Sequence, residues 1–155
     1  MDVMERRFLG IDYGAKRIGL AVSDPSGTIA SPLKTLPAAG SCDEQVRDVI
    51  DGAKDFDIDE WVVGLPVNMD GTSGPQAKLA ERFARQLADA TGAPVRLWDE
   101  RLSSYEADSR LARSGLTHKK KKRRRDAIAA QVILQSYLDA HAHQSVDRGA
   151  IPPPD

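Results

Sequence analysis

The sequence predicts an α/β fold in which a five-stranded mixed sheet, with three antiparallel strands followed by two parallel ones, is flanked by helices. Near the N-terminus, three apolar segments are separated only by short turn sequences, which is typical of antiparallel hairpins. After residue 40, short apolar segments alternate with segments of helical period, which favours parallel strands joined by helical crossovers. The length of 155 residues fits one domain of this kind.

The first three strands are expected over residues 8–11, 17–23 and 28–36. Asp12 closes the first strand, and the sequence Tyr13-Gly14-Ala15-Lys16 that follows reads as a turn. Asp24-Pro25-Ser26-Gly27 is a second strong turn signal. Pro32 lies inside the third strand and cannot donate a hydrogen bond to a neighbour, so this strand is predicted at the edge of the sheet.

The second half of the chain alternates between helices and strands. Ser41 and Glu44 have the spacing of a capping box, and an amphipathic helix is predicted from there to Ala53. The later elements are a strand at 61–64, a loop at 65–74, a helix at 76–90, a strand at 95–98, a capping box at 103–106 with a helix to 113, a basic loop at 114–125 and a buried helix at 126–142. Residues 1–142 are therefore predicted as a single domain, and 143–155 as a disordered C-terminal tail.

The composition excludes several classes of protein. No apolar run is long enough to cross a bilayer, and the charged segment 1–7 lacks the apolar core of a secretory signal. Cys42 is the single cysteine, so an internal disulfide and a cysteine metal cluster are both excluded. These features favour a cytoplasmic protein without a membrane partner. The net charge of -1 hides seven consecutive cations at positions 119–125, which create a local positive field.

Three carboxylates are predicted to meet at one crevice. Binding sites of such sheets lie beyond the carboxyl ends of the strands, and Asp12 ends the first strand while Glu100 follows the last. Asp126 is expected to begin the final helix, from which it could reach the same crevice. Clustered carboxylates repel one another unless a cation lies between them, and hard oxygen ligands select Mg²⁺ or Mn²⁺. The three acids are therefore predicted as metal ligands of a catalytic site.

Each carboxylate also has an ordinary structural interpretation. Asp12 could be a turn residue, Asp126 a helix cap, and Glu100 a partner of Arg101. Asp99 is the neighbour that competes with Glu100, although alternation along the strand sends the two side chains in opposite directions. The metal site is predicted from the three positions taken together, not from any one of them.

Four segments carry a family resemblance. The segments 10–21 (GIDYGAKRIGLA), 64–72 (GLP with MDGT), 99–104 (DERLSS) and 126–138 (DAIAA with IL and YL) resemble, in order, the motifs of the YqgF family of the RNase H-like superfamily. That family is described as Holliday junction resolvase-like and as a nuclease of pre-16S ribosomal RNA. The resemblance implies an RNase H-like fold and an endonuclease of structured nucleic acid, with maturation of the 5′ end of pre-16S rRNA as the favoured role. It also implies that Asp12, Glu100 and Asp126 occupy the acidic positions of the family.

A set of cations is predicted to bind the substrate backbone, although each member could instead belong to a solvated loop or to the hairpin surface. The set comprises Lys16, Arg17, Arg101, Lys119, Lys120, Lys121, Lys122, Arg123, Arg124 and Arg125.

Three further functions compete with the rRNA nuclease. Junction resolvases often carry a fourth acid one helical turn after the third, whereas this chain has Ala129, which weakens the hypothesis of a Holliday junction resolvase. A nucleic-acid-binding module without catalysis could use the same cations. A phosphotransferase is the third hypothesis, because an Asp-x-Gly turn also holds ATP phosphates in actin-like kinases, but those enzymes bind nucleotide between two such domains.

The chain is expected to act as a monomer or homodimer.

Overall fold

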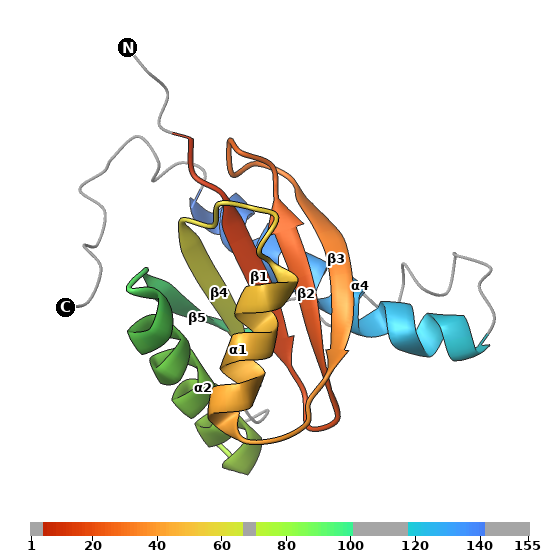
Figure 1. The fold of residues 1–155 in the computed structure, drawn as a ribbon. Helices are drawn as coiled ribbons and strands as arrows, with labels where there is room; N and C mark the ends of the chain where they lie inside the picture. The colour runs from red at the N-terminus through yellow and green to blue at the C-terminus, as the bar shows by residue number, and fades with distance from the viewer. Residues whose placement is uncertain (1–4, 67–70, 101–117, 142–155) are drawn as a thin grey trace.

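The computed structural model describes residues 5–66, 71–100 and 118–141, and for residues 118–124 it describes the path of the backbone only. Five strands form one sheet in the order β3-β2-β1-β4-β5. Helices α1 and α2 cover one face of this sheet, and α4 crosses the other face (Figure 1). The predicted mixed sheet with flanking helices is confirmed. The helix predicted at 103–113 and the tail at 143–155 lie outside the described residues.

The N-terminal half forms the predicted antiparallel meander. Strand β1 (Phe8–Tyr13) pairs with β2 (Arg17–Ser23), and β2 pairs with β3 (Ala30–Pro37). β3 lies at the edge, as Pro32 predicted, and the register of the β2–β3 pair shifts between Leu20 and Ala21, opposite this proline. Asp24 fixes the turn before β3, because its carboxylate accepts hydrogen bonds from the backbone N–H groups of Thr28 and Ile29.

The second half adds two parallel strands through helical connections. The capping box at Ser41 and Glu44 is present and begins helix α1 (Cys42–Gly52). Strand β4 (Glu60–Leu65) pairs parallel with β1, and after helix α2 (Pro75–Thr91) strand β5 (Val95–Asp99) pairs parallel with β4. Gly92 ends α2 in the left-handed conformation, with a φ of 70°, which a glycine adopts without steric cost.

The two faces of the sheet differ in the size of their side chains. Alternation along each strand sends large apolar residues to the α1–α2 face, where they pack into one core: Leu9, Ile11, Ile18, Leu20, Trp61 and Val63. The face covered by α4 instead carries small residues in the central strands, Gly10, Gly19, Ala21 and Gly64. The small residues allow the backbone of α4 to approach the sheet closely.

Helix α4 (His118–His141) begins earlier than predicted. The basic loop predicted at 114–125 is wrong for residues 118–125, and so is the predicted start of the helix at Asp126, because the cations at 119–125 lie in the first turns of the helix. Residues 114–117 lie outside the described residues. Lysine and arginine are good helix formers, and the run contains no glycine or proline that would stop a helix. In Figure 1 this basic end of α4 extends past the edge of the sheet beside β3. None of the described helices is long and apolar enough to span a membrane.

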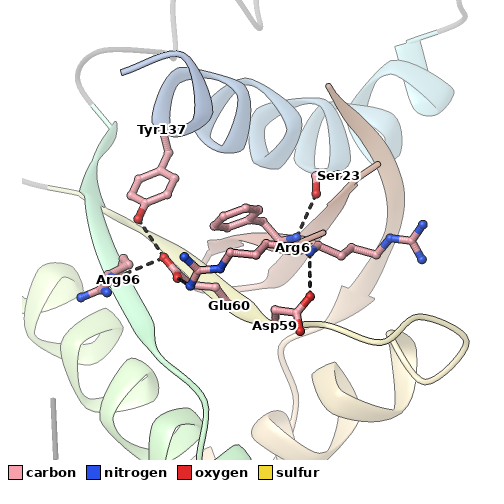
Figure 2. Close-up of polar contacts among 8 residues, drawn as sticks. Arg6, Ser23, Asp59, Glu60, Arg96 and Tyr137 are labelled. Atoms are coloured by element: carbon pink, nitrogen blue, oxygen red, sulfur yellow. Dashed lines mark hydrogen bonds and ion pairs between the residues drawn. The ribbon is translucent and has the colours of Figure 1, made fainter. Parts of the chain in front are cut away.

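A buried ionic network fixes the other end of α4 to the sheet. Glu60, at the start of β4, is 3% exposed and accepts a hydrogen bond from the hydroxyl of Tyr137 at 2.9 Å (Figure 2). Arg6 donates to the other carboxylate oxygen of Glu60 at 2.5 Å, and Arg96 lies 3.3 Å from the oxygen that Tyr137 contacts. A buried carboxylate is tolerated only when it is paired and hydrogen-bonded in this way. Tyr137 therefore anchors α4 to β4 and β5.

The Tyr137 hydroxyl should make the protein sensitive to alkaline pH. Burial, and then the charge and hydrogen bond of Glu60, raise the pKa of Tyr137 above its ordinary value of 10.0. A raised pKa in the folded protein gives stability that is complete below pH 10 and is lost as pH rises above it, because the unfolded chain releases the proton first. We expect Tyr137→Phe to lower the free energy of unfolding by about 1 kcal/mol at pH 7 and to reduce its fall above pH 10. Urea denaturation of both proteins between pH 7 and 11 measures this, and parallel curves would contradict it.

Candidate active site

Asp12 lies on the α4 face of the sheet, at the end where the parallel strands finish. It is the last but one residue of β1, and its partner across the β1–β2 pair is Gly19. Residues directly opposite each other in an antiparallel pair project to the same face, so the Asp12 side chain and the empty side-chain position of Gly19 are neighbours. The strand neighbours of Asp12, Ile11 and Tyr13, pack into the core on the opposite face.

Gly19 is the point where α4 comes closest to the sheet. A Cβ atom at this position would lie 1.9 Å from the carbonyl oxygen of Asp126 and 2.3 Å from its carbonyl carbon. The backbone of α4 therefore fills the space that any other residue type would occupy. This contact places Asp126 next to Asp12, although the two residues are more than a hundred positions apart in sequence.

Asp126 lies inside α4 and is not its N-cap, so the helix-cap interpretation is wrong. Its carboxylate oxygen Oδ2 accepts a hydrogen bond from Nε of Arg17 at 2.5 Å. Arg17 begins β2 directly after the tight turn closed by the hydrogen bond from the Gly14 N–H to the Arg17 carbonyl oxygen. The hairpin between β1 and β2 thus supplies both Asp12 and the cation that holds Asp126.

Glu100 reaches the same region from the other side. It follows β5 directly, and its Cγ and Oε2 atoms lie 2.8 and 3.1 Å from where a Cβ atom of Gly64 would be. Trp98, two residues earlier, donates its indole N–H to the hydroxyl of Ser136 on α4, so this register of β5 faces α4. Asp99 follows Trp98 and belongs to the alternate register. Glu100 thus lies on the α4 face, and the choice of Glu100 over Asp99 as a ligand stays a prediction.

The pKa values of Asp12 and Glu100 are raised by burial and by neighbouring carboxylates. Burial, and then the charge of Asp126, raise the pKa of Asp12 from 3.8 to about 6. Burial, and then the charges of Asp12 and Asp99, raise the pKa of Glu100 from 4.5 to about 8. Asp12 is thus near enough to interact electrostatically with Asp126 and with Glu100. On the α4 face of the sheet, in the region called the crevice below, Asp12 therefore has Asp126 and Glu100 within electrostatic reach, and their role as metal ligands stays a prediction.

The carboxylates of Asp12, Glu100 and Asp126 are oxygen ligands of the kind that a hard divalent cation prefers. They are not grouped closely enough to form a ready-made metal site. Partly buried carboxylates with raised pKa values are groups that a cation would stabilise in their charged form. Among the residues that the structure describes, no three acidic, histidine or cysteine side chains are close enough to form a ready-made metal site. Asp126 is paired with Arg17 in this arrangement, and that pairing involves one of its two oxygens.

The predicted cations lie on the β1–β2 hairpin, on α4, or outside the described residues. Arg17 lies in the crevice, whereas Lys16 is an exposed residue of the hairpin turn. Arg125 is exposed on α4, one residue before Asp126. Lys119, Lys120, Lys121, Lys122, Arg123 and Arg124 form the first turns of α4, and nothing is described of their side chains. Arg101 lies outside the described residues.

Three glycines that allow close contacts on the α4 face were not among the predicted site residues. Gly10, Gly19 and Gly64 lie on three adjacent strands, and a Cβ atom at each would overlap with atoms of α4, of Glu100, or of both. A glycine inside a strand weakens it and marks a place where another group approaches closely. That signal was available at all three positions, because each lies within a predicted apolar strand.

The family model and the curated relatives that match this chain point to the same family. A family model described as "RuvX: Holliday junction resolvase" matches residues 6–140, and it corresponds to the resemblance expected from the sequence. A protein of Anaeromyxobacter dehalogenans named "Putative pre-16S rRNA nuclease" is 47% identical over 136 residues, which cover 88% of this chain and 98% of that protein. Proteins of the same name from Clavibacter sepedonicus and Syntrophus aciditrophicus are 46% and 41% identical, covering 94% and 93% of this chain and 90% and 95% of their own lengths.

The fold also has a solved counterpart. The structure of Thermus thermophilus RuvC in complex with a Holliday junction substrate aligns with a TM-score of 0.55 at 16% sequence identity, and covers 89% of this chain and 96% of that one. A second Thermus thermophilus RuvC structure aligns with a TM-score of 0.51 at 17% identity. The RNase H-like fold expected from the resemblance is confirmed.

The raised pKa of Glu100 makes a specific prediction for stability. Because the folded protein holds this proton up to about pH 8, stability from Glu100 is complete below pH 4.5 and is lost as pH rises towards 8. We expect Glu100→Gln to melt at a higher temperature than the native protein at pH 8 without divalent cations, by about 2–4 °C for each kcal/mol of relieved repulsion. The difference should vanish near pH 4.5. A Glu81→Gln variant, altered on α2, is the control, and an unchanged pH profile of Glu100→Gln would contradict the prediction.

The contact at Gly19 predicts a large loss of stability from a single methyl group. Gly19→Ala forces α4 away from β2, because the atoms that a Cβ would meet belong to the helix backbone. Overpacking of this kind costs about 1–3 kcal/mol or more, and we expect the upper end of that range by urea denaturation. The matched control is Gly52→Ala in α1, where the nearest atom is the flexible end of Leu20 at 3.2 Å. That variant should stay within about 1 kcal/mol of the native protein. Equal losses for the two variants would show that α4 is free to move.

Proposed function

The chain belongs to the RuvX family of Holliday junction resolvases, and from this premise we propose that it is a metal-dependent endonuclease that hydrolyses phosphodiester bonds of structured nucleic acid. The favoured role is cytoplasmic maturation of the 5′ end of pre-16S rRNA, a step of ribosome biogenesis, because the relatives at 41–47% identity carry that name. The observation that supports the proposal is the closeness of Asp12 to both other acids: the charge of Asp126 raises the pKa of Asp12, and the charge of Asp12 raises the pKa of Glu100.

The three carboxylates would hold Mg²⁺ or Mn²⁺. A bound ion of this kind activates a water molecule and stabilises the leaving oxygen of a phosphodiester. Asp12 and Glu100 are largely buried, so their charged forms would be weakly screened and would attract a cation strongly. Arg17 orients Asp126 through Oδ2 and leaves Oδ1 outside that ion pair, so Asp126 could contribute one oxygen without losing Arg17.

The basic residues would bind the phosphate backbone. In the sequence, cations lie close to each of the three acids. Lys16 and Arg17 follow Asp12, and Arg101 follows Glu100. The run from Lys119 to Arg125 directly precedes Asp126 on α4. Contacts of this kind supply affinity that depends on salt and is independent of base sequence. The structure of the bound nucleic acid, rather than its sequence, would then select the cleavage site.

Branched DNA is the second candidate substrate. It is favoured by the description of the family and by the fold shared with RuvC. The residue one helical turn after Asp126 is Ala129, so α4 does not supply a fourth carboxylate there. This departure favours RNA over a junction, whose symmetrical cleavage would also require a dimer.

The proposed function is tested with two substrates and one pair of matched variants. We expect the native protein with Mn²⁺ to cleave a pre-16S rRNA 5′ leader and to leave a four-way DNA junction largely intact. Asp12→Asn should lower the cleavage rate by at least about a hundredfold, since even outer partners of a metal site contribute 10–100-fold. The control Asp51→Asn changes an exposed carboxylate of α1 and should cleave normally.

Each different outcome assigns a different function. Cleavage of the junction alone would identify a resolvase. Binding of RNA without cleavage by the native protein, with equal affinity for Asp12→Asn, would identify a non-catalytic module. Equal cleavage rates for the native protein and Asp12→Asn would overturn the assigned site.

A further inference from the structure

Glu100 and Asp12 come from strands that are not neighbours. Asp12 lies on β1 and Glu100 follows β5, with β4 between the two strands. Adjacent strands lie about 4.8 Å apart, so the backbones of β1 and β5 are separated by about 10 Å. A side chain that starts at the end of β5 and approaches Asp12 must therefore cross over β4.

Gly64 is the residue of β4 over which Glu100 crosses. It pairs with Trp98, two residues before Glu100, and it is on the face that α4 covers. A Cβ atom at Gly64 would lie 2.8 Å from Cγ of Glu100 and 3.1 Å from its Oε2. The Glu100 side chain thus occupies the volume that the side chain of any other residue at position 64 would fill.

At Gly10 and Gly19, the nearest atoms that a Cβ would meet all belong to α4. A Cβ atom at Gly10 would meet Cβ of Leu134 at 2.6 Å, and one at Gly19 would meet the backbone at Asp126. Gly64 shares this property in part, because its Cβ would also lie 2.7 Å from Cδ1 of Ile133. Its contact with an acidic side chain distinguishes it from Gly10 and Gly19.

We propose that Gly64 is a positioning residue that lets the Glu100 carboxylate lie across β4 towards Asp12. The inference rests on the proposed function, in which Glu100 is a metal ligand. A methyl group at position 64 displaces Cγ of Glu100 and moves its carboxylate away from Asp12. The divalent ion then loses a ligand while the fold is kept.

The experiment separates this effect from simple crowding of α4. Ile133→Val removes the Cδ1 atom that an alanine at position 64 would strike, and leaves the contact with Glu100 unchanged. We therefore compare Gly64→Ala/Ile133→Val with Ile133→Val alone. The readouts are the melting temperature without metal, the Mn²⁺ affinity by isothermal titration calorimetry, and the kcat and KM of cleavage.

We expect the double variant to melt within about 4 °C of Ile133→Val, a difference of roughly 1 kcal/mol or less. Its Mn²⁺ affinity should fall by about tenfold or more, as in losses of groups that orient metal ligands. Its kcat should fall at subsaturating Mn²⁺ with little change in the KM for nucleic acid. Glu100→Gln should show the same losses, and adding Gly64→Ala to Glu100→Gln should cause no further loss of affinity.

Two controls decide the remaining outcomes. If the double variant melts well below Ile133→Val, its Mn²⁺ affinity is compared with that of Gly10→Ala, which crowds α4 without touching Glu100. Equal Mn²⁺ affinities in the Gly10 and Gly64 variants would then overturn the inference. Native Mn²⁺ affinity in the double variant would also overturn it, while loss of cleavage in Glu100→Gln would leave the proposed function intact. Normal metal binding and cleavage by Glu100→Gln would instead overturn the proposed function itself.

Discussion

The close approach of α4 to the central strands is the constraint on which the crevice depends. A Cβ atom at Gly19 would lie 1.9 Å from the Asp126 carbonyl oxygen, so the helix backbone rests directly on β2. Gly10 extends the same contact surface along β1, where Leu134 and Ala130 pack. A helix separated from the sheet by ordinary side chains would hold its axis about 10 Å from the strands, as packed layers generally do. Asp126 would then lie too far from Asp12 for their charges to interact strongly.

The same closeness has an electrostatic cost, which the fold meets in two ways. Burial raises the pKa values of Asp12 and Glu100, so the crevice is destabilising when both groups are charged. Arg17 neutralises the third acid locally, and the Glu60 network fixes α4 at its far end through Tyr137. Residues that serve function commonly reduce stability in this way, and the structure around them supplies the compensation. Tyr137, the partner of Glu60 on α4, lies about three helical turns from Asp126. The buried charge of Glu60 therefore holds the helix at a distance from Asp12 and Asp126.

The fold was largely predictable because local signals and the overall arrangement agree. Ser41 and Glu44 begin α1 as their spacing indicates, and Pro32 marks the edge strand. The start of α4 was mispredicted, because a run of like charges resembles a solvated loop, whereas its high helix propensity and the packing of the later turns extend the helix back to His118. The positions of Asp12 and Glu100 near the ends of β1 and β5 were predictable, because the apolar runs before them mark the strands. The pairing of Arg17 with Asp126 and the crossing of Glu100 over Gly64 were not, because both depend on distances between elements that periodicity does not encode.

A helix offers an advantage over a loop as the support for Asp126. A loop that began the helix at Asp126 would leave this carboxylate on a segment with its own freedom of movement, whereas the third turn of a continuous helix is fixed by the turns on both sides. The basic residues before Asp126 are then carried on the same rigid element, which Figure 1 shows extending past β3. Helix α4 thus carries the basic segment at 119–125, then Asp126 with its partner Arg17, and then Tyr137 with its partner Glu60. The predicted phosphate contacts and one of the three predicted metal ligands therefore belong to one continuous helix.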